Sequence, residues 1–259
     1  MRIKTYKIIN EILNLLLAVF VIGLIAEGIY IFSNLKNFSG QKETNNNEII
    51  VGTKGQPNGE LKNEPPPGLN IPNSVNLNIP FIVQAPLGDW SPPFNHSCEE
   101  AAVLTIHYFF QKEIADDPQK LSRGIQELAD FEVEKYGFHE DTSAAQTARL
   151  IKDYYNYEAK VFYNISIDDI KKEVAKGNPV IVPAAGRLLN NPYFTPPGPV
   201  DHMLVIKGYN EKEIITNDPG TRRGADFVYS YQILEEAIRD YGQGSEGKKA
   251  MIVIYPPSK

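Results

Sequence analysis

The sequence predicts an α+β domain in residues 75–259, with helices first and an antiparallel sheet after them. The first reason is the presence of residue patterns that are typical of helix starts. Ser97-Cys98-Glu99-Glu100 has the pattern of a capping box, with Ser97 as N-cap and Glu100 at the third helical position, and Asp117-Pro118 is typical of a second helix start. The second reason is a series of short β-branched or alternating runs in the later half, bounded by Gly, Pro and Asn.

Each expected element has a local cause. The helix that begins at Ser97 carries residues at helical spacing that suit a buried face: Ala101, Ala102, Thr105, Tyr108 and Phe109. Two more helices are expected at about 143–155 and 167–175, the second of them ended by Lys176-Gly177. The expected strands are residues 179–184, 203–209, 213–217 and 250–255.

The first residues predict one transmembrane helix ahead of this domain. Arg2, Lys4 and Lys7 precede the largely apolar residues 8–32, and the stretch 12–26 carries no charge. A spanning helix needs about 20 apolar residues, whereas a secretory signal core has about 7–15. Bulky apolar residues follow the candidate cleavage site Ala26-Glu27-Gly28, which favours an uncleaved signal anchor over a secreted form cut after Gly28. The basic flank places residues 1–7 in the cytoplasm and the domain outside it, at the cell membrane.

Residues 33–74 are expected to form a disordered linker. In residues 36–74, 18 of 39 positions are Asn, Pro or Gly. Such a composition cannot bury enough apolar surface to offset the entropy lost on ordering the chain. We therefore expect this segment to hold the domain away from the membrane.

Composition narrows the class of function. The formal net charge is −6, so the chain has no basic footprint for nucleic acid. A single cysteine excludes an intrachain disulfide and a multi-cysteine metal site. The sequence contains no Walker or dinucleotide loop and no His-Glu-x-x-His helix. We therefore expect neither a cofactor nor a metal.

Cys98 is the strongest single candidate for chemistry. It occupies the first position of a capped helix, where unpaired N–H groups and the helix dipole favour an anion and lower the pKa of a thiol. A buried structural cysteine is the alternative. A helix start after a polar loop is an unusual place for a core residue, which favours the functional interpretation.

A nucleophilic cysteine needs a base, and the best placed histidine is His202. It begins the strand 203–206 directly after a loop rich in Pro and Gly, and a sheet edge is a rigid mount for an imidazole. His107 lies nine residues after Cys98 on the same helix and faces the other side. His96 and His139 are expected in turns, with His96 either a bystander or a residue that lines a cleft.

Two more residues complete the candidate site. Asp218 ends a strand that is expected to pair with the strand of His202, so its carboxylate would lie beside the imidazole. Asn217 is the alternative orienting residue. Gln84 precedes Cys98 and carries an amide that can donate to an oxyanion. Taken alone, each of these is an ordinary turn or loop residue.

In this order, Gln84, helix-start Cys98, strand His202 and Asp218-Pro219 resemble the motifs of papain-like cysteine peptidases. The resemblance is closest to the bacteriocin-processing branch, whose members cleave leader peptides after a double glycine, and to its stand-alone peptidase-like members. It covers residues 79–108, 178–185 and 198–220, and more loosely 137–157. It implies a papain-like fold, whose N-terminal helical half carries the cysteine and whose C-terminal antiparallel sheet carries the histidine and the aspartate.

By the same resemblance, Cys98 is the nucleophile, His202 the general acid and base, Asp218 the orienting group and Gln84 the oxyanion donor. The implied function is a membrane-anchored cysteine peptidase that acts on a peptide or protein substrate through a thioester, with the Cys98 thiolate ion-paired to His202 at neutral pH. The family commonly has Gly after the cysteine, and Glu99 adds negative charge there. An acyl transferase or amidase on the same residues, and an inactive peptide-binding module, are the alternatives.

Overall fold

The computed structural model describes residues 71–242 and 246–256. The expected cytoplasmic residues 1–7, the expected anchor 8–32 and nearly all of the expected linker 33–74 therefore lie outside the described residues. Within those that are described, no helix combines the length and the apolar character that crossing a bilayer requires.

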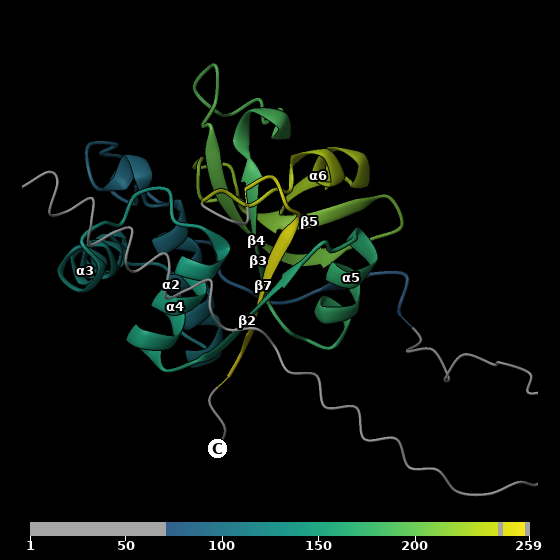
Figure 1. The fold of residues 1–259 in the computed structure, drawn as a ribbon, viewed down its shortest axis with the longest axis horizontal. Coiled ribbons are helices and arrows are strands. Elements are labelled where there is room, and N and C mark those ends of the chain that lie inside the picture. Colours follow the sequence, from purple (N-terminus) through teal and green to yellow (C-terminus); the bar gives the residue numbers. More distant parts are fainter. Residues whose placement is uncertain (1–70, 243–245, 257–259) are drawn as a thin grey trace, which may run out of the picture. The chain divides into compact units, whose positions relative to one another are not determined.

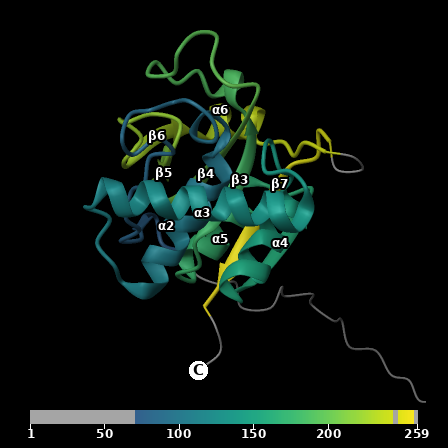
Figure 2. The same ribbon diagram turned by 90° about the vertical axis from the view of Figure 1, so that its left-hand side faces the viewer.

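The helices come first along the chain, as the sequence predicts. α2 (Cys98–Gln111), α3 (Pro118–Tyr136) and α4 (Ala144–Tyr155) gather on one side of a sheet, and α5 (Ile167–Ala175) and α6 (Tyr231–Ala237) lie on the other (Figure 1). Seen from the first side, α3 crosses in front of the sheet with α4 beside it (Figure 2). Short 3-10 helices occupy Phe94–His96 and Gly186–Leu189.

The described strands form one sheet of seven, in which every pairing is antiparallel. Its order is β2 (Glu158–Tyr163), β7 (Ala250–Tyr255), β3 (Val180–Ala185), β4 (Asp201–Tyr209), β5 (Glu213–Asn217) and β6 (Phe227–Ser230), while β1 (Val75–Asn76) pairs with β4. The α+β class and the antiparallel sheet are thus confirmed.

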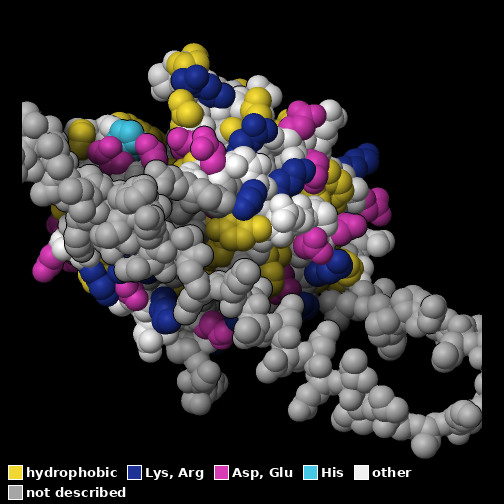
Figure 3. Space-filling model, viewed as in Figure 1, with side chains coloured by type: hydrophobic (Ala, Val, Ile, Leu, Met, Phe, Trp, Pro, Cys, Tyr) yellow, Lys and Arg dark blue, Asp and Glu magenta, His cyan; other side chains and the backbone are white. Residues whose placement is uncertain are grey.

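Two hydrophobic cores lie on the two faces of this sheet, because successive side chains of a strand point to opposite faces. On β4, Met203 and Val205 pack with α2, α3 and α4, whereas Leu204 and Ile206 pack with α5 and α6. The start of β4 therefore lies against the helix that begins at Cys98. On the molecular face drawn in Figure 3, acidic and basic side chains are interspersed.

Local signals predicted most element boundaries. Asp117 caps α3 with Pro118 at the first position, and Ser143 caps α4 in a complete capping box with Gln146. The capping box expected at α2 is wrong: Ser97 is the N-cap, but its hydroxyl donates to the Pro93 carbonyl at 3.0 Å. Glu100 is instead buried against other side chains. Strands β1, β2 and β6 and helix α6 are additional to the prediction.

Folded structure begins before the expected domain start at residue 75. Ile71 packs against the core on the α5 and α6 face, and the Pro72 carbonyl accepts a hydrogen bond from the Tyr209 hydroxyl at 3.0 Å. β1 then pairs with the end of β4, with Val75 opposite Tyr209. The last residues assigned to the linker, 71–74, therefore belong to the folded part.

Candidate active site

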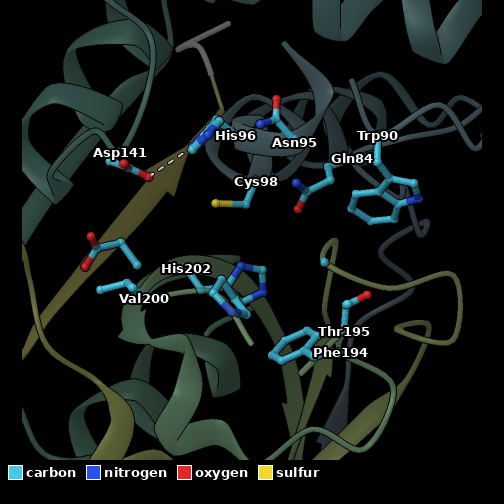
Figure 4. A pocket seen from close by; sticks show the side chains of 13 residues that line it. Gln84, Trp90, Asn95, His96, Cys98, Asp141, Phe194, Thr195, Val200 and His202 are labelled. Carbon is cyan, nitrogen blue, oxygen red and sulfur yellow. Dashed lines mark ion pairs between the residues drawn. The ribbon is translucent and has the colours of Figure 1, made fainter. Parts of the chain in front are cut away.

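Three of the four predicted site residues line one cleft of about 380 Å³. Gln84 and Cys98 lie on one wall and His202 lies opposite them, with Trp90 and Phe194 at one end (Figure 4). The other residues that line it are Asn95, His96, Asp141, Thr195, Pro199, Val200, Asp201 and Gly220. A neighbouring hollow of about 340 Å³ shares Trp90, Thr195 and Gly220 with this cleft, so the two adjoin.

Cys98 is the first residue of α2, as predicted, and is 6% exposed. Its thiol donates a hydrogen bond to Glu99 Oε2, with Sγ and Oε2 3.0 Å apart. Burial raises the pKa of Cys98 well above its usual range, the Glu99 carboxylate raises it further, and the backbone N–H of Met203 lowers it. The predicted low-pKa thiolate paired with His202 is therefore wrong for this geometry, since the partner of the thiol is an acid rather than the imidazole.

His202 is a buried residue of β4, held by a carboxylate on one nitrogen. Its Nε2 lies 2.8 Å from Asp218 Oδ1, and the ring of Phe194 stands edge-on to it at 5.3 Å between centroids. A carboxylate accepts only, so Nε2 carries the proton of a neutral imidazole and Nδ1 keeps its lone pair. Nδ1 is thus the nitrogen that can accept a proton.

Asp218 lies behind His202, is fully buried and accepts four hydrogen bonds. Oδ1 accepts from His202 and from the Gly220 N–H at 3.0 Å; Oδ2 accepts from Tyr229 Oη at 2.5 Å and from Asn191 Nδ2 at 3.0 Å. Burial alone would raise the pKa of Asp218, but its interaction with His202 and the hydrogen bonds from Tyr229 and the Gly220 N–H together hold that pKa below its usual range. The carboxylate is therefore kept ionised.

Asn217 points away from the imidazole. Its Nδ2 donates to the carbonyls of Ile79 at 3.1 Å and Pro80 at 2.8 Å, and its Oδ1 accepts from the Asp226 N–H. Asn217 pairs with Val205 in the β4–β5 ladder, so the following residue falls beside the start of β4. Of the two alternatives, it is Asp218 that contacts His202.

Gln84 is held so that its amide faces the cleft. Its backbone N–H donates to the Pro219 carbonyl at 3.0 Å, and one hydrogen of Nε2 is used by the Phe94 carbonyl at 2.8 Å. An amide has a second hydrogen, and the first N–H groups of α2 have no partner within the helix. Gln84 and the start of α2 can therefore donate together to a negative oxygen beside Cys98.

The other three histidines contact groups other than Asp218. His107 stacks on Tyr155 at 4.0 Å and contacts Tyr157 Oη, away from the cleft. His139 Nδ1 lies 3.1 Å from Glu100 Oε1. His96 does line the cleft, but its Nδ1 faces Asp141 Oδ1 at 3.7 Å (Figure 4).

Sequence reasoning missed the groups that surround the predicted residues. Asn191 and Tyr229 bind Asp218, while Trp90, Asp141 and Asp201 shape the cleft. Trp90, Asp141 and Asn191 come from loops, Tyr229 from the unpredicted β6 and Asp201 from the first position of β4, and none of them has a motif of its own. Among the described residues, no group of three or more His, Cys, Asp and Glu side chains is arranged to hold a metal ion.

Three buried carboxyl groups lie behind Cys98. Glu99 Oε1 accepts from the Thr142 N–H at 3.0 Å and from Tyr241 Oη at 2.8 Å. Glu100 contacts His139, and neither oxygen of Glu132 has a donor in the part of the chain that the structure describes. Burial, reinforced by Glu100 and Glu99, raises the pKa of Glu132 to about 10. At neutral pH this group of acids therefore holds at least one extra proton.

A family model described as peptidase C39-like matches residues 76–246, more than half of the chain and all four predicted site residues. The chain belongs to the peptidase C39-like family. Among solved structures, a Bacillus anthracis protein described as C39-like peptidase matches with a TM-score of 0.48 and 19% identity, over 72% of this chain and 99% of that one. No curated protein matches significantly. Family membership confirms, at the level of the family, the resemblance to papain-like peptidases that the motifs predicted.

Proposed function

We propose that this C39-like protein is a cysteine peptidase with Cys98 as nucleophile, His202 as general acid and base, Asp218 as orienting group and Gln84 as oxyanion donor. The observation that carries the proposal is the single cleft that Gln84, Cys98 and His202 share, backed by the fully buried contact of His202 with Asp218. The cleft and the hollow that adjoins it together offer room on both sides of Trp90 for a peptide chain.

The reaction follows from these positions. His202 Nδ1 takes the proton of Cys98, and Asp218 stabilises the imidazolium that forms. The thiolate attacks the scissile carbonyl carbon, and the resulting oxyanion accepts from Gln84 Nε2 and from the start of α2. As the C–N bond breaks, the imidazolium gives its proton to the leaving amine, which leaves a thioester on Cys98. Water, deprotonated by His202, then hydrolyses the thioester and releases the acid.

One observation favours a second candidate, a peptide-binding module without activity. The thiol donates to Glu99, which keeps it in the protonated, weakly nucleophilic form. An acyl transferase or amidase would use the same thioester with an amine or a different amide. The products distinguish these enzymes from a peptidase.

The test is cleavage of a peptide library by the full-length protein in detergent, read by mass spectrometry. We expect Cys98→Ala to abolish cleavage, His202→Ala to remove nearly all of it, and Asp218→Ala to be milder. His96→Ala is the matched control, because His96 lines the cleft without contacting Asp218, and it should change the rate by no more than a few fold. Cleavage that survives Cys98→Ala would refute the proposal, and peptide binding without turnover would establish the binding module.

We also propose that the protein is a single-pass cell membrane protein, anchored by residues 8–32 with the catalytic domain outside the cytoplasm. The support is the sequence alone: a basic flank before one apolar run.

A further inference from the structure

Glu99, the acid that contacts Cys98, is held in place by hydrogen bonds to other parts of the chain. Glu99 is fully buried, and each of its oxygens has a donor: Cys98 Sγ at 3.0 Å on Oε2, and the Thr142 N–H and Tyr241 Oη on Oε1. Burial raises the pKa of Glu99 above its usual value, whereas the hydrogen bonds from Cys98 and Tyr241 lower it and favour the ionised form. Its place in the first turn of α2 favours a negative charge as well.

The thiolate of Cys98 and the carboxylate of Glu99 compete for the same environment. They are adjacent at one helix N-terminus, buried and in direct contact, and two like charges at that distance cannot both form. The pair therefore shares one proton. The two donors on Oε1 stabilise the charge on Glu99, so the proton resides on sulfur.

We propose that Glu99 is a positioning residue that keeps the Cys98 thiol protonated and directed away from His202 in the resting protein. The inference rests on the proposed role of Cys98 as nucleophile. In the resting state the proton stays on Sγ and the charge on Glu99. For reaction, the Sγ–H···Oε2 bond is exchanged for a bond to His202 Nδ1, and the proton moves to that nitrogen. The thiolate that forms is then out of contact with Oε2 and paired with the imidazolium, so Glu99 can remain a carboxylate.

Other titratable groups face this pair from several elements, and they bear on its pH dependence. They are Glu100 on α2, Glu132 on α3, His139 and Asp141 in the loop before α4, Asp201 and His202 on β4, and Asp240 and Tyr241 after α6. Most of them are acids, so the surroundings oppose a second negative charge on Cys98. Within the part of the chain that the structure describes, none of these groups accepts a hydrogen bond from the thiol, which donates to Glu99.

Glu99→Gln isolates this contact. The amide oxygen can take the place of Oε1 and keep the donors from Thr142 and Tyr241, while the NH2 group replaces Oε2 and donates to sulfur. This removes one anion and adds a donor, and both changes favour the thiolate. The readout is the pH profile of iodoacetamide alkylation of Cys98 in the full-length protein, with circular dichroism to establish folding.

We expect the midpoint of the wild-type profile to lie above that of a free thiol and that of Glu99→Gln to lie at least one pH unit lower. Each unit multiplies the thiolate fraction by ten but weakens its nucleophilicity, so alkylation at pH 7 should rise about threefold per unit. Glu100→Gln is the matched control: an equally buried acid on the next residue that does not bond to sulfur, so its shift should be much smaller. Tyr241→Phe should shift the midpoint in the same direction as Glu99→Gln, by less.

A wild-type midpoint below 7.5, or a midpoint that neither Glu99→Gln nor Tyr241→Phe moves, would overturn the inference and leave Glu99 a purely structural residue. If Glu99→Gln does not fold, Tyr241→Phe decides alone. His202→Ala separates this result from the proposed function. A profile that Glu99→Gln shifts but His202→Ala leaves unchanged supports the role of Glu99 in the resting protein, whereas peptide cleavage that survives His202→Ala would refute the proposed function.

Discussion

Removing one hydroxyl, in Tyr229→Phe, tests how the candidate site holds its orienting carboxylate. Tyr229 Oη donates to Asp218 Oδ2 at 2.5 Å in a fully buried setting. The substitution keeps the ring and leaves no large cavity. Asn191 Nδ2 still donates to the same oxygen at 3.0 Å, and the bonds from His202 and Gly220 to Oδ1 are untouched. The change is therefore the loss of the hydrogen bond to the charged carboxylate, together with the weaker bond that Tyr229 Oη accepts from Asn191 Nδ2 at 2.9 Å.

A hydrogen bond to a charged group contributes about 1.5–3 kcal/mol to the free energy of unfolding. For a domain of this size, 1 kcal/mol corresponds to about 2–4 °C in Tm, so we expect Tyr229→Phe to lower Tm by about 3–12 °C at pH 7. Tyr154→Phe is the control, because Tyr154 is 36% exposed and its hydroxyl is not part of the site. It should stay within about 1 °C of wild type.

The pH dependence gives a second, independent readout. The folded pKa of Asp218 lies below its usual value, so the stability it contributes is present above the unfolded pKa and is lost as the pH falls through the folded one. Tyr229→Phe removes one cause of the lowering and raises that pKa. The acid unfolding midpoint should therefore move to higher pH, as followed by circular dichroism. An unchanged Tm, or a lower Tm with an unchanged acid midpoint, would refute the reasoning.

Two further predictions concern other parts of the chain. Burial raises the pKa of Glu132 to about 10, so the stability that Glu132 contributes is present below its unfolded pKa and is lost as the pH rises toward 10. Glu132→Gln should therefore stabilise the protein by about 2–4 kcal/mol at pH 7 and make its Tm nearly constant between pH 5 and 9. A wild-type Tm that is already constant over this pH range would contradict the prediction. For the proposed anchor, protease added outside spheroplasts should digest the domain, and a protected domain would reverse the orientation, while a mature N-terminus at Ile29 would show a cleaved signal peptide.

The features of this fold that could be predicted from the sequence are those that depend on residues close together along the chain. Asp117-Pro118 and Ser143 fixed two helix starts because a cap is a local hydrogen bond. The pairing of β4 with β5 brought Asp218 to His202 because the two strands are adjacent in sequence and antiparallel. Strand β2 was missed because it is largely exposed and lies at the sheet edge, where no buried run marks it.

The rest depended on contacts between distant residues. Ser97 and Glu100 have the sequence pattern of a capping box, but the Glu100 side chain contacts His139 instead of the backbone at Ser97. The position of His139, 39 residues later, cannot be inferred from the local sequence. The charge of Glu99 was visible in the sequence, whereas its contact with sulfur depends on donors far along the chain at Thr142 and Tyr241. Choosing Asp218 over Asn217 likewise required the register of the sheet.

The first described segment, residues 71–84, connects the start of the folded part to the cleft. After β1 it is bonded along β4 and β5: Leu77 to Lys207 at 2.8 Å, Ile79 and Pro80 to Asn217, and finally Gln84 to Pro219. A Cβ atom at Gly208 would come within 2.4 Å of the Val75 carbonyl oxygen, so this segment packs directly against the backbone of β4. Because these bonds run from β1 to Gln84, we expect a change in how residues 71–76 are held to alter the position of the Gln84 amide in the cleft. A truncation or fusion at the start of the folded part would therefore affect the proposed oxyanion donor as well as the stability of the fold.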